Sequence, residues 1–176
     1  MVISRISFFN GVSETASTRG LEIPDALFAA FQMMFPIITV AILTGAAAGR
    51  MRFTPLIIFI IFWLLLVYFP FAHMVWDEGL LAQWGTIDFA GGDVVSYYLW
   101  GFRFGFGIGT WKTRDYNRLE YRPHNVPFVF LGAGLLWFGW FGFNAGSALA
   151  ADGLAVHAFV TTHISAAAAM LFLVAC

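Results

Sequence analysis

The sequence predicts an all-α membrane protein with about five transmembrane helices. Of its 176 residues, 60% are hydrophobic and only 11% are charged, and the mean hydropathy is +0.80. Several uncharged stretches are long enough, at about 1.5 Å of rise per residue, to cross a bilayer as helices. A soluble domain of this length does not combine so much apolar sequence with so few charges.

Composition also limits the function. The net charge is −1, so no basic surface indicates nucleic-acid binding. The single cysteine, Cys176, excludes an internal disulfide framework and a cysteine metal cluster. Because no histidines and acids cluster at ligand spacing, we predict no metal site. We also expect no other cofactor and no enzymatic activity.

The N-terminal half divides into a polar lead-in and two crossings. Residues 1–25 mix both charges with polar side chains, which predicts an extramembrane lead-in, while 26–176 form the transmembrane domain. The first crossing is predicted over 26–49 and the second over 53–76, because neither stretch contains a charged residue. Pro70 is expected to kink the second helix near its exit.

The remaining crossings differ in strength. The third, over 89–111, is the weakest because Asp93 and Arg103 interrupt it. The fourth occupies the uncharged stretch 124–147, and the fifth runs from 153 to 176. Together with the first two, these segments give the five helices.

The distribution of charge supports an odd number of crossings. Basic residues concentrate in the loops at 50–52 and 112–122, whereas the loop at 77–88 and the turn at 152 carry acids. The positive-inside rule places the basic loops in the cytoplasm. We therefore expect the N-terminus outside and the C-terminus in the cytoplasm, in a plasma or cell inner membrane.

The stretch 124–147 interleaves glycines with tryptophans and phenylalanines. The Gly142/Gly146 pair has the small-xxx-small spacing of close helix packing in membranes, and the aromatic rings can wall a narrow passage. Asn144 and Ser147 are costly in a membrane unless they are paired or face a cavity. A helix that only packs against its neighbours is the alternative interpretation.

Three runs together resemble the ammonium transporter (Amt/Mep/Rh) family. They are FAAFQMMFPIITVAILTGAAAGRMRF (28–53), YFPFAHMVWDEGLLAQWGTIDFAGGDVV (68–95) and PHNVPFVFLGAGLLWFGWFGFNAGSALA (123–150). The likeness covers most of residues 20–172, with a gap near 96–122. It implies a partial ammonium-transporter fold, a central fragment corresponding to roughly the third to seventh of about eleven helices.

The resemblance implies ammonium or ammonia as the substrate. Such a pore needs an aromatic face and a hydroxyl at its mouth, because these hold a cation by cation–π attraction and a hydrogen bond. By resemblance, Trp76 and Ser147 form this recruitment site, joined by Phe35 and Phe143. The remaining implied roles are a pore gate of Phe31 and Phe35, and structural positions at Asp88, Gln32 and Asn144.

Each of these residues also has a simpler interpretation. Trp76 could belong to the aromatic belt at a membrane interface. Phe31 and Phe35 are one helical turn apart and could simply pack together. Asp88 could cap a helix, and the Ser147 hydroxyl could bond its own helix backbone.

The sequence departs from the family in one chemically important place. Where the resemblance implies a first histidine of a proton relay, this chain has Ser96, and the second relay histidine belongs to a later helix. The usual proton-handling mechanism is therefore not carried over. We hypothesise that reading-frame shifts altered residues 93–114 and the C-terminal tail, which the encoding nucleotide sequence would test.

Three functions follow, in descending order. The first is ammonium transport by family, in a truncated copy with impaired or no activity alone, embedded in the lipid bilayer. The second is a regulatory or interaction subunit. In that case the chain is expected to assemble as a homotrimer or to associate with full-length homologues. The third is a membrane enzyme or haem anchor using His73, His157 and His163, which ranks last because the latter two do not share a helix face.

Overall fold

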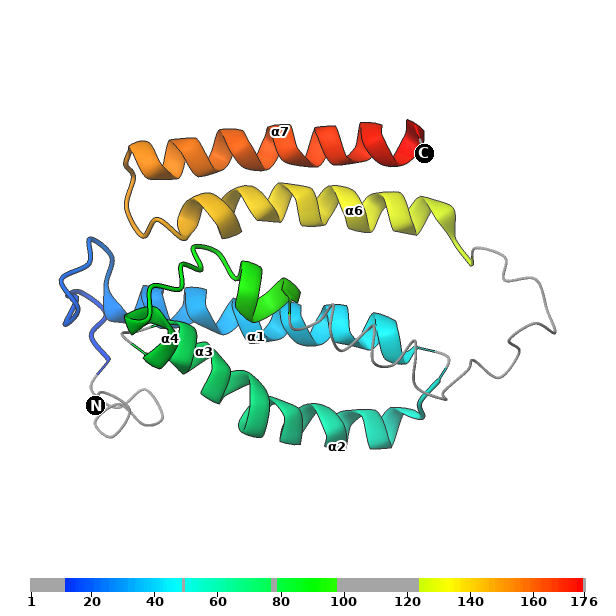
Figure 1. Ribbon diagram of the computed structural model, residues 1–176, viewed down its shortest axis with the longest axis horizontal. Helices are drawn as coiled ribbons and strands as arrows, with labels where there is room; N and C mark the ends of the chain where they lie inside the picture. The colour runs from blue at the N-terminus through cyan, green and yellow to red at the C-terminus, as the bar shows by residue number, and fades with distance from the viewer. Residues whose placement is uncertain (1–11, 49, 77–78, 98–123, 176) are drawn as a thin grey trace. The chain divides into compact units, whose positions relative to one another are not determined.

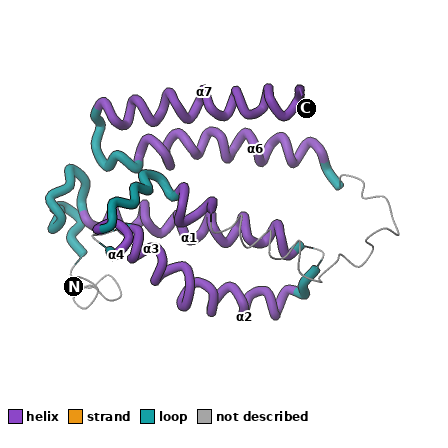
Figure 2. The backbone as a smooth tube through the Cα atoms, viewed as in Figure 1, coloured by secondary structure: helices purple, strands orange, loops and turns teal. Residues whose placement is uncertain are grey.

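The computed structural model describes residues 12–48, 50–76, 79–97 and 124–175. Within these ranges every regular element is helical and no strand occurs (Figure 2). Four helices are long and apolar enough to cross a membrane. The predicted all-α membrane fold is confirmed by these helices, and the chain is an integral membrane protein with several apolar helices.

The chain forms two compact units, which are described separately below. Met1–Phe31 and Pro123–Cys176 make up one unit, here called the hairpin unit. Gln32–Arg122 make up the other, here called the central unit. This division assigns the predicted functional residues to two groups.

Helix α1, Asp25–Ala47, corresponds to the first predicted crossing. Its first residue ties the helix to the lead-in, because the Asp25 carboxylate accepts the Thr18 amide at 3.1 and 3.0 Å. The Asp25 amide donates in turn to the Ala16 carbonyl at 3.2 Å. The lead-in therefore supplies partners for a helix end that would otherwise keep unsatisfied groups.

The second predicted crossing contains three consecutive helical segments. They are α2 (Phe53–Trp63), the π-helical turn η1 (Leu64–Tyr68) and α3 (Phe69–Val75). Pro70 lies at the start of α3 and has no amide hydrogen, so the regular bond to the carbonyl four residues earlier cannot form. The π-helical turn η1 just before Pro70 holds one residue more than an α-helical turn. The ribbon changes direction between α2 and α3 (Figure 1).

The segment after α3 is irregular at first. The single-turn helix α4, Leu80–Gln83, leads through a glycine turn into the π-helical segment η2, Gly92–Tyr97. Only this start of the crossing predicted over 89–111 is described. The remainder of that crossing, and most of the 93–114 region attributed to a frame shift, lie outside the described residues.

The fourth and fifth predicted crossings form an antiparallel hairpin (Figure 1). It consists of α6 (Val126–Trp140), the π-helical turn η3 (Phe141–Ala145) and α7 (Gly153–Ala175). The Asn125 side chain caps α6 by accepting the Phe128 amide at 3.1 Å. The Asp152 carboxylate caps α7 by accepting the Ala155 amide at 2.9 Å. Polar caps at both helix starts explain why these helices begin where they do.

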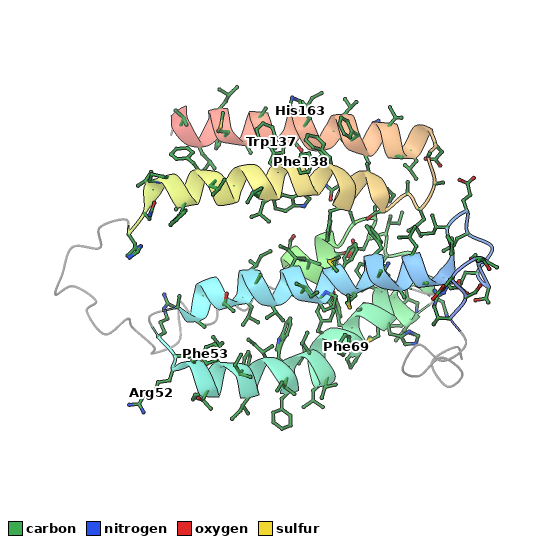
Figure 3. All side chains as sticks on the ribbon, turned by 180° about the vertical axis from the view of Figure 1, so that it is seen from behind. Arg52, Phe53, Phe69, Trp137, Phe138 and His163 are labelled. Carbon is green, nitrogen blue, oxygen red and sulfur yellow. The ribbon has the colours of Figure 1, made fainter. Side chains whose placement is uncertain are left out.

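Aromatic rings join the two arms of the hairpin. Phe141 stacks on Phe159, with ring centroids 4.4 Å apart. Trp137 stacks on His163 at 5.4 Å with an interplanar angle of 19°, and both residues are labelled in Figure 3. His163 thus lies against apolar rings in this hairpin, in agreement with a packing role.

The glycines of α6 and η3 do not bring a helix backbone close within the hairpin unit. A Cβ atom built at Gly132, Gly134, Gly139 or Gly142 meets no described atom within 4 Å. The close approach predicted at Gly142 therefore has no counterpart within this unit. Gly146 differs, because a Cβ there would lie 3.4 Å from the Phe31 ring.

Candidate functional site

Phe35 and Trp76 form an edge-to-face aromatic pair in the central unit. Their ring centroids lie 5.3 Å apart with an interplanar angle of 83°. Phe35 comes from the middle of α1 and is 2% exposed, whereas Trp76 ends α3 in an extended conformation and is half-buried. This is a favourable arrangement for two aromatic quadrupoles, and it leaves part of the indole open to a further group.

A hydrogen bond fixes the orientation of Trp76. Its indole Nε1–H donates to the carbonyl oxygen of Asp88 at 3.0 Å. The only hydrogen-bond donor of the side chain is thereby occupied. What remains for a ligand is the π system of the indole, which attracts cations.

Asp88 organises the turn that holds this carbonyl. Its Oδ1 accepts the amides of Gly91 and Gly92 at 2.6 and 2.9 Å. Its Oδ2 accepts the amides of Asp93 and Val94, both at 3.0 Å. These are the free amides at the start of η2, where a carboxylate is stabilising. In the structure the Asp88 carboxylate is therefore engaged by backbone amides.

Phe31, Phe143 and Ser147 come together in the hairpin unit. The Phe31 and Phe143 rings are tilted by 48° with centroids 6.5 Å apart. The Ser147 hydroxyl donates to the Phe143 carbonyl oxygen at 2.8 Å, which matches the alternative that this serine bonds its own backbone. Because its proton is used in this way, the Ser147 oxygen can only accept a bond from a ligand.

Asn144 is paired within the hairpin unit. Its Nδ2 donates to the Thr162 hydroxyl oxygen on α7 at 3.0 Å. Thr162 is 9% exposed, and its hydroxyl donates to the Ala158 carbonyl at 2.6 Å. The bond links η3 to α7 across the hairpin, so it satisfies polar groups that would be costly alone in a membrane.

Gln32 and Ser96 lie near the two ends of the described part of the central unit. Gln32 lies half-buried on α1 between Phe31 and Phe35 in sequence. Ser96 lies on η2 with its side chain exposed, and its amide donates to the Gly91 carbonyl at 3.2 Å. A serine hydroxyl does not titrate near neutral pH, so it cannot store a proton as an imidazole does.

The predicted site residues thus form two groups. Phe35 and Trp76 pair in the central unit, beside the turn built by Asp88. Phe31, Phe143 and Ser147 group in the hairpin unit. That Trp76 and Ser147 form one recruitment site at the mouth of a pore remains a prediction.

Sequence reasoning missed several polar and small residues near these groups. Tyr68 is 4% exposed, and its hydroxyl lies near Thr39 without a well-formed hydrogen bond to any described residue. Thr39 itself donates to the Phe35 carbonyl at 2.6 Å. A polar residue inside an otherwise apolar stretch was the available signal for Tyr68, Thr39 and Thr162.

No group of three or more metal-ligating side chains occurs in the described parts of the chain. His73 and His157 are exposed there, and His163 stacks on Trp137 and Phe141.

Comparison with known proteins gives a consistent result. The model of the Ammonium Transporter Family matches residues 2–176. The chain is 48% identical over 148 residues to the "Ammonium transporter" of Bacillus subtilis (strain 168), covering 83% of this chain and 36% of that protein. It is 42% identical over 170 residues to "Ammonium transporter Amt1" of Archaeoglobus fulgidus, covering 93% and 44%. It is 44% identical over 151 residues to "Ammonium transporter 1" of Schizosaccharomyces pombe, covering 85% and 30%. The chain therefore spans less than half the length of these relatives.

Proposed function

This chain belongs to the Ammonium Transporter Family, and we propose from that membership that it forms part of a path for ammonium or ammonia across a membrane. The single observation that best supports the proposal is the Phe35–Trp76 pair. Its indole N–H is already bonded to the Asp88 carbonyl, so the pair offers π surface rather than a hydrogen-bond donor. A surface of that kind recognises a small cation.

Ser147 supplies the complementary contact in this proposal. An ammonium ion carries four N–H donors, and the Ser147 oxygen presents only acceptor lone pairs once its proton is bound to the Phe143 carbonyl. Cation–π attraction contributes about 0.5–2 kcal/mol, and a hydrogen bond from a charged donor adds about 1.5–3 kcal/mol. Trp76 and Ser147 together would recruit the cation at the outer mouth, with Phe31 and Phe35 as the gate.

Deeper in the path, Ser96 changes what the chain can do with a proton. Its hydroxyl can pass on a hydrogen bond but cannot hold a proton at neutral pH. We therefore propose that ammonium handling in this chain does not run through an imidazole at position 96.

The 176-residue polypeptide on its own is proposed to transport weakly or not at all. Large apolar side chains remain exposed along α6 and α7, including Phe130 at 75% and Leu173 at 75%. Longer relatives carry sequence that this chain does not match. Helices that are so open are expected to need lipid or further helices around them before a closed path exists.

Methylammonium gives the direct test. The purified chain is expected to bind it, with Trp76→Ala and Ser147→Ala each weakening binding. Uptake into a strain without ammonium transporters of its own is expected to be low for the chain alone. Equal binding by wild type and Trp76→Ala would overturn the recruitment site.

The open helices also support a second function, association with intact ammonium transporters or assembly as a homotrimer. None of the most apolar window of the α6–η3 span is buried within the described structure. Co-purification with a full-length homologue in mild detergent tests this function, with an unrelated polytopic membrane protein as control. Recovery of the chain as a monomer, without the homologue, would rule out this second function.

A further inference from the structure

Gly91 has a backbone conformation that is fixed from both sides. Its φ angle is +85°, in the left-handed region that residues with a Cβ rarely adopt. Its amide donates to Asp88 Oδ1 at 2.6 Å. Its carbonyl accepts the amides of Val95 and Ser96 at 2.9 and 3.2 Å. The backbone at Gly91 therefore cannot move away from its neighbours without breaking these bonds.

The side chains of Val95 and Phe35 both lie beside Gly91. A Cβ at this position would lie 3.4 Å from both Cδ1 and Cε1 of Phe35, and 2.7 Å from Cγ2 of Val95. Phe35 is 2% exposed and Val95 is 5% exposed, so both side chains are buried beside the turn. The absence of a side chain at Gly91 thus lets the Phe35 ring lie close to the turn, and a methyl group there would crowd Val95 directly and touch the Phe35 ring.

The same turn holds the partner of that ring. The Asp88 carbonyl, three residues before Gly91, accepts the Trp76 indole N–H at 3.0 Å. Trp76 meets Phe35 edge to face at 5.3 Å. The turn therefore contacts one ring through a hydrogen bond and the other through a glycine that leaves room for it.

We propose that Gly91 is a positioning residue, which sets the depth of the Phe35 ring against Trp76 and so the geometry of the cation-recruiting pair. This inference rests on the proposed role of Phe35 and Trp76 in binding the cation. Gly91 acts through Phe35 and does not touch the ligand.

Gly85 provides a matched control in the same unit. Its φ angle is +90°, yet a Cβ there would meet no described atom within 4 Å. Gly85→Ala and Gly91→Ala therefore carry similar backbone strain, and only Gly91→Ala adds a group against Val95 and Phe35.

The test uses the full chain labelled with 5-fluorotryptophan in detergent, with the Trp76 signal assigned from Trp76→Phe. Gly91→Ala is expected to move the Trp76 fluorine resonance, and Gly85→Ala to leave it in place. Adding Gly91→Ala to Phe35→Ala is expected to cause no further movement. Equal effects of the two glycine variants, or a Gly91→Ala effect that persists without Phe35, would overturn the proposal. If Gly91→Ala does not fold, the double variant Gly91→Ala/Val95→Ala is used instead, because it removes the closest contact of the new methyl group. An unmoved Trp76 resonance in that double variant would refute the proposal.

Methylammonium titration of the same samples separates this inference from the proposed function. Gly91→Ala is expected to weaken apparent binding about three- to tenfold, while maximal occupancy is retained. A wild-type Trp76 resonance that does not respond to methylammonium would count against cation recruitment by the pair. Even in that case, the shift of the Trp76 resonance caused by Gly91→Ala would report whether Gly91 positions the aromatic pair.

Discussion

The Asn144 amide donates to the Thr162 hydroxyl at 3.0 Å and so links η3 to α7. The bond joins residues eighteen positions apart in sequence, and it runs between two segments, whereas the other hydroxyls of α7 bond carbonyls of their own helix. It is a specific polar contact in the hairpin, and its contribution can be measured.

A double-mutant cycle of Asn144→Ala and Thr162→Val is expected to give a coupling energy of about 0.6–2 kcal/mol, as for other hydrogen bonds between membrane helices. Unfolding in sodium dodecyl sulfate titrations measures it. Thr161→Val is the control, because the Thr161 hydroxyl donates to the His157 and Ala158 carbonyls of its own helix. A coupling equal to that between Asn144 and Thr161 would contradict the assignment.

Replacing Asp88 by alanine is expected to destabilise the chain by about 1–2 kcal/mol, because four amides lose their acceptor. Asp88→Asn keeps one acceptor oxygen and is expected to cost less. Thermal unfolding in detergent measures both. Asp152→Ala is the control, since that carboxylate accepts the amide of Ala155 at the start of α7; an equal loss there would show that Asp88 is an ordinary cap.

Ser147→Ala is expected to weaken methylammonium binding about tenfold, because an acceptor for a charged donor is removed. Equilibrium binding of radiolabelled methylammonium to the solubilised chain measures the effect. Ser165→Ala removes a similar hydroxyl, which donates to the Thr161 carbonyl at 2.7 Å, and is expected to leave binding unchanged. If both variants bind as wild type does, Ser147 is only a backbone-bonded serine.

The single cysteine tests membrane orientation. Because basic loops favour the cytoplasmic side, Cys176 is expected to react with a membrane-impermeant maleimide only after cells are permeabilised. Thr15→Cys in a Cys176→Ser background places the thiol in the lead-in and is expected to react in intact cells. The reverse pattern would invert the predicted topology.

The crossings could be predicted from sequence because each depends on a local property. The predicted segments 26–49 and 153–176 differ from the helices Asp25–Ala47 and Gly153–Ala175 only at their ends. Absence of charge over a bilayer's thickness is visible without knowing any partner. The Pro70 kink was also readable, since proline removes a specific helical bond.

The contacts of the candidate site could not be predicted in the same way. Trp76 and Asp88 are named by the family resemblance, but the bond from the indole to the Asp88 carbonyl depends on how the irregular turn folds. Likewise, Gly91 reads as an ordinary turn glycine until its neighbour Phe35, fifty-six residues earlier, is seen against it. Such relationships arise from packing between distant segments.

The π-helical turn before Pro70 changes how far the residues after it are rotated about the helix axis of the second crossing. In η1 the Phe69 amide bonds to the Leu64 carbonyl, five residues back, so this turn holds one residue more than an α-helical turn. If the same residues wound as a regular α-helix, each would turn further about the axis, and everything after them would rotate by roughly one residue's step, about 100°, relative to α2. Trp76 would then leave the azimuth at which Phe35 meets it, although no residue of either ring had been changed.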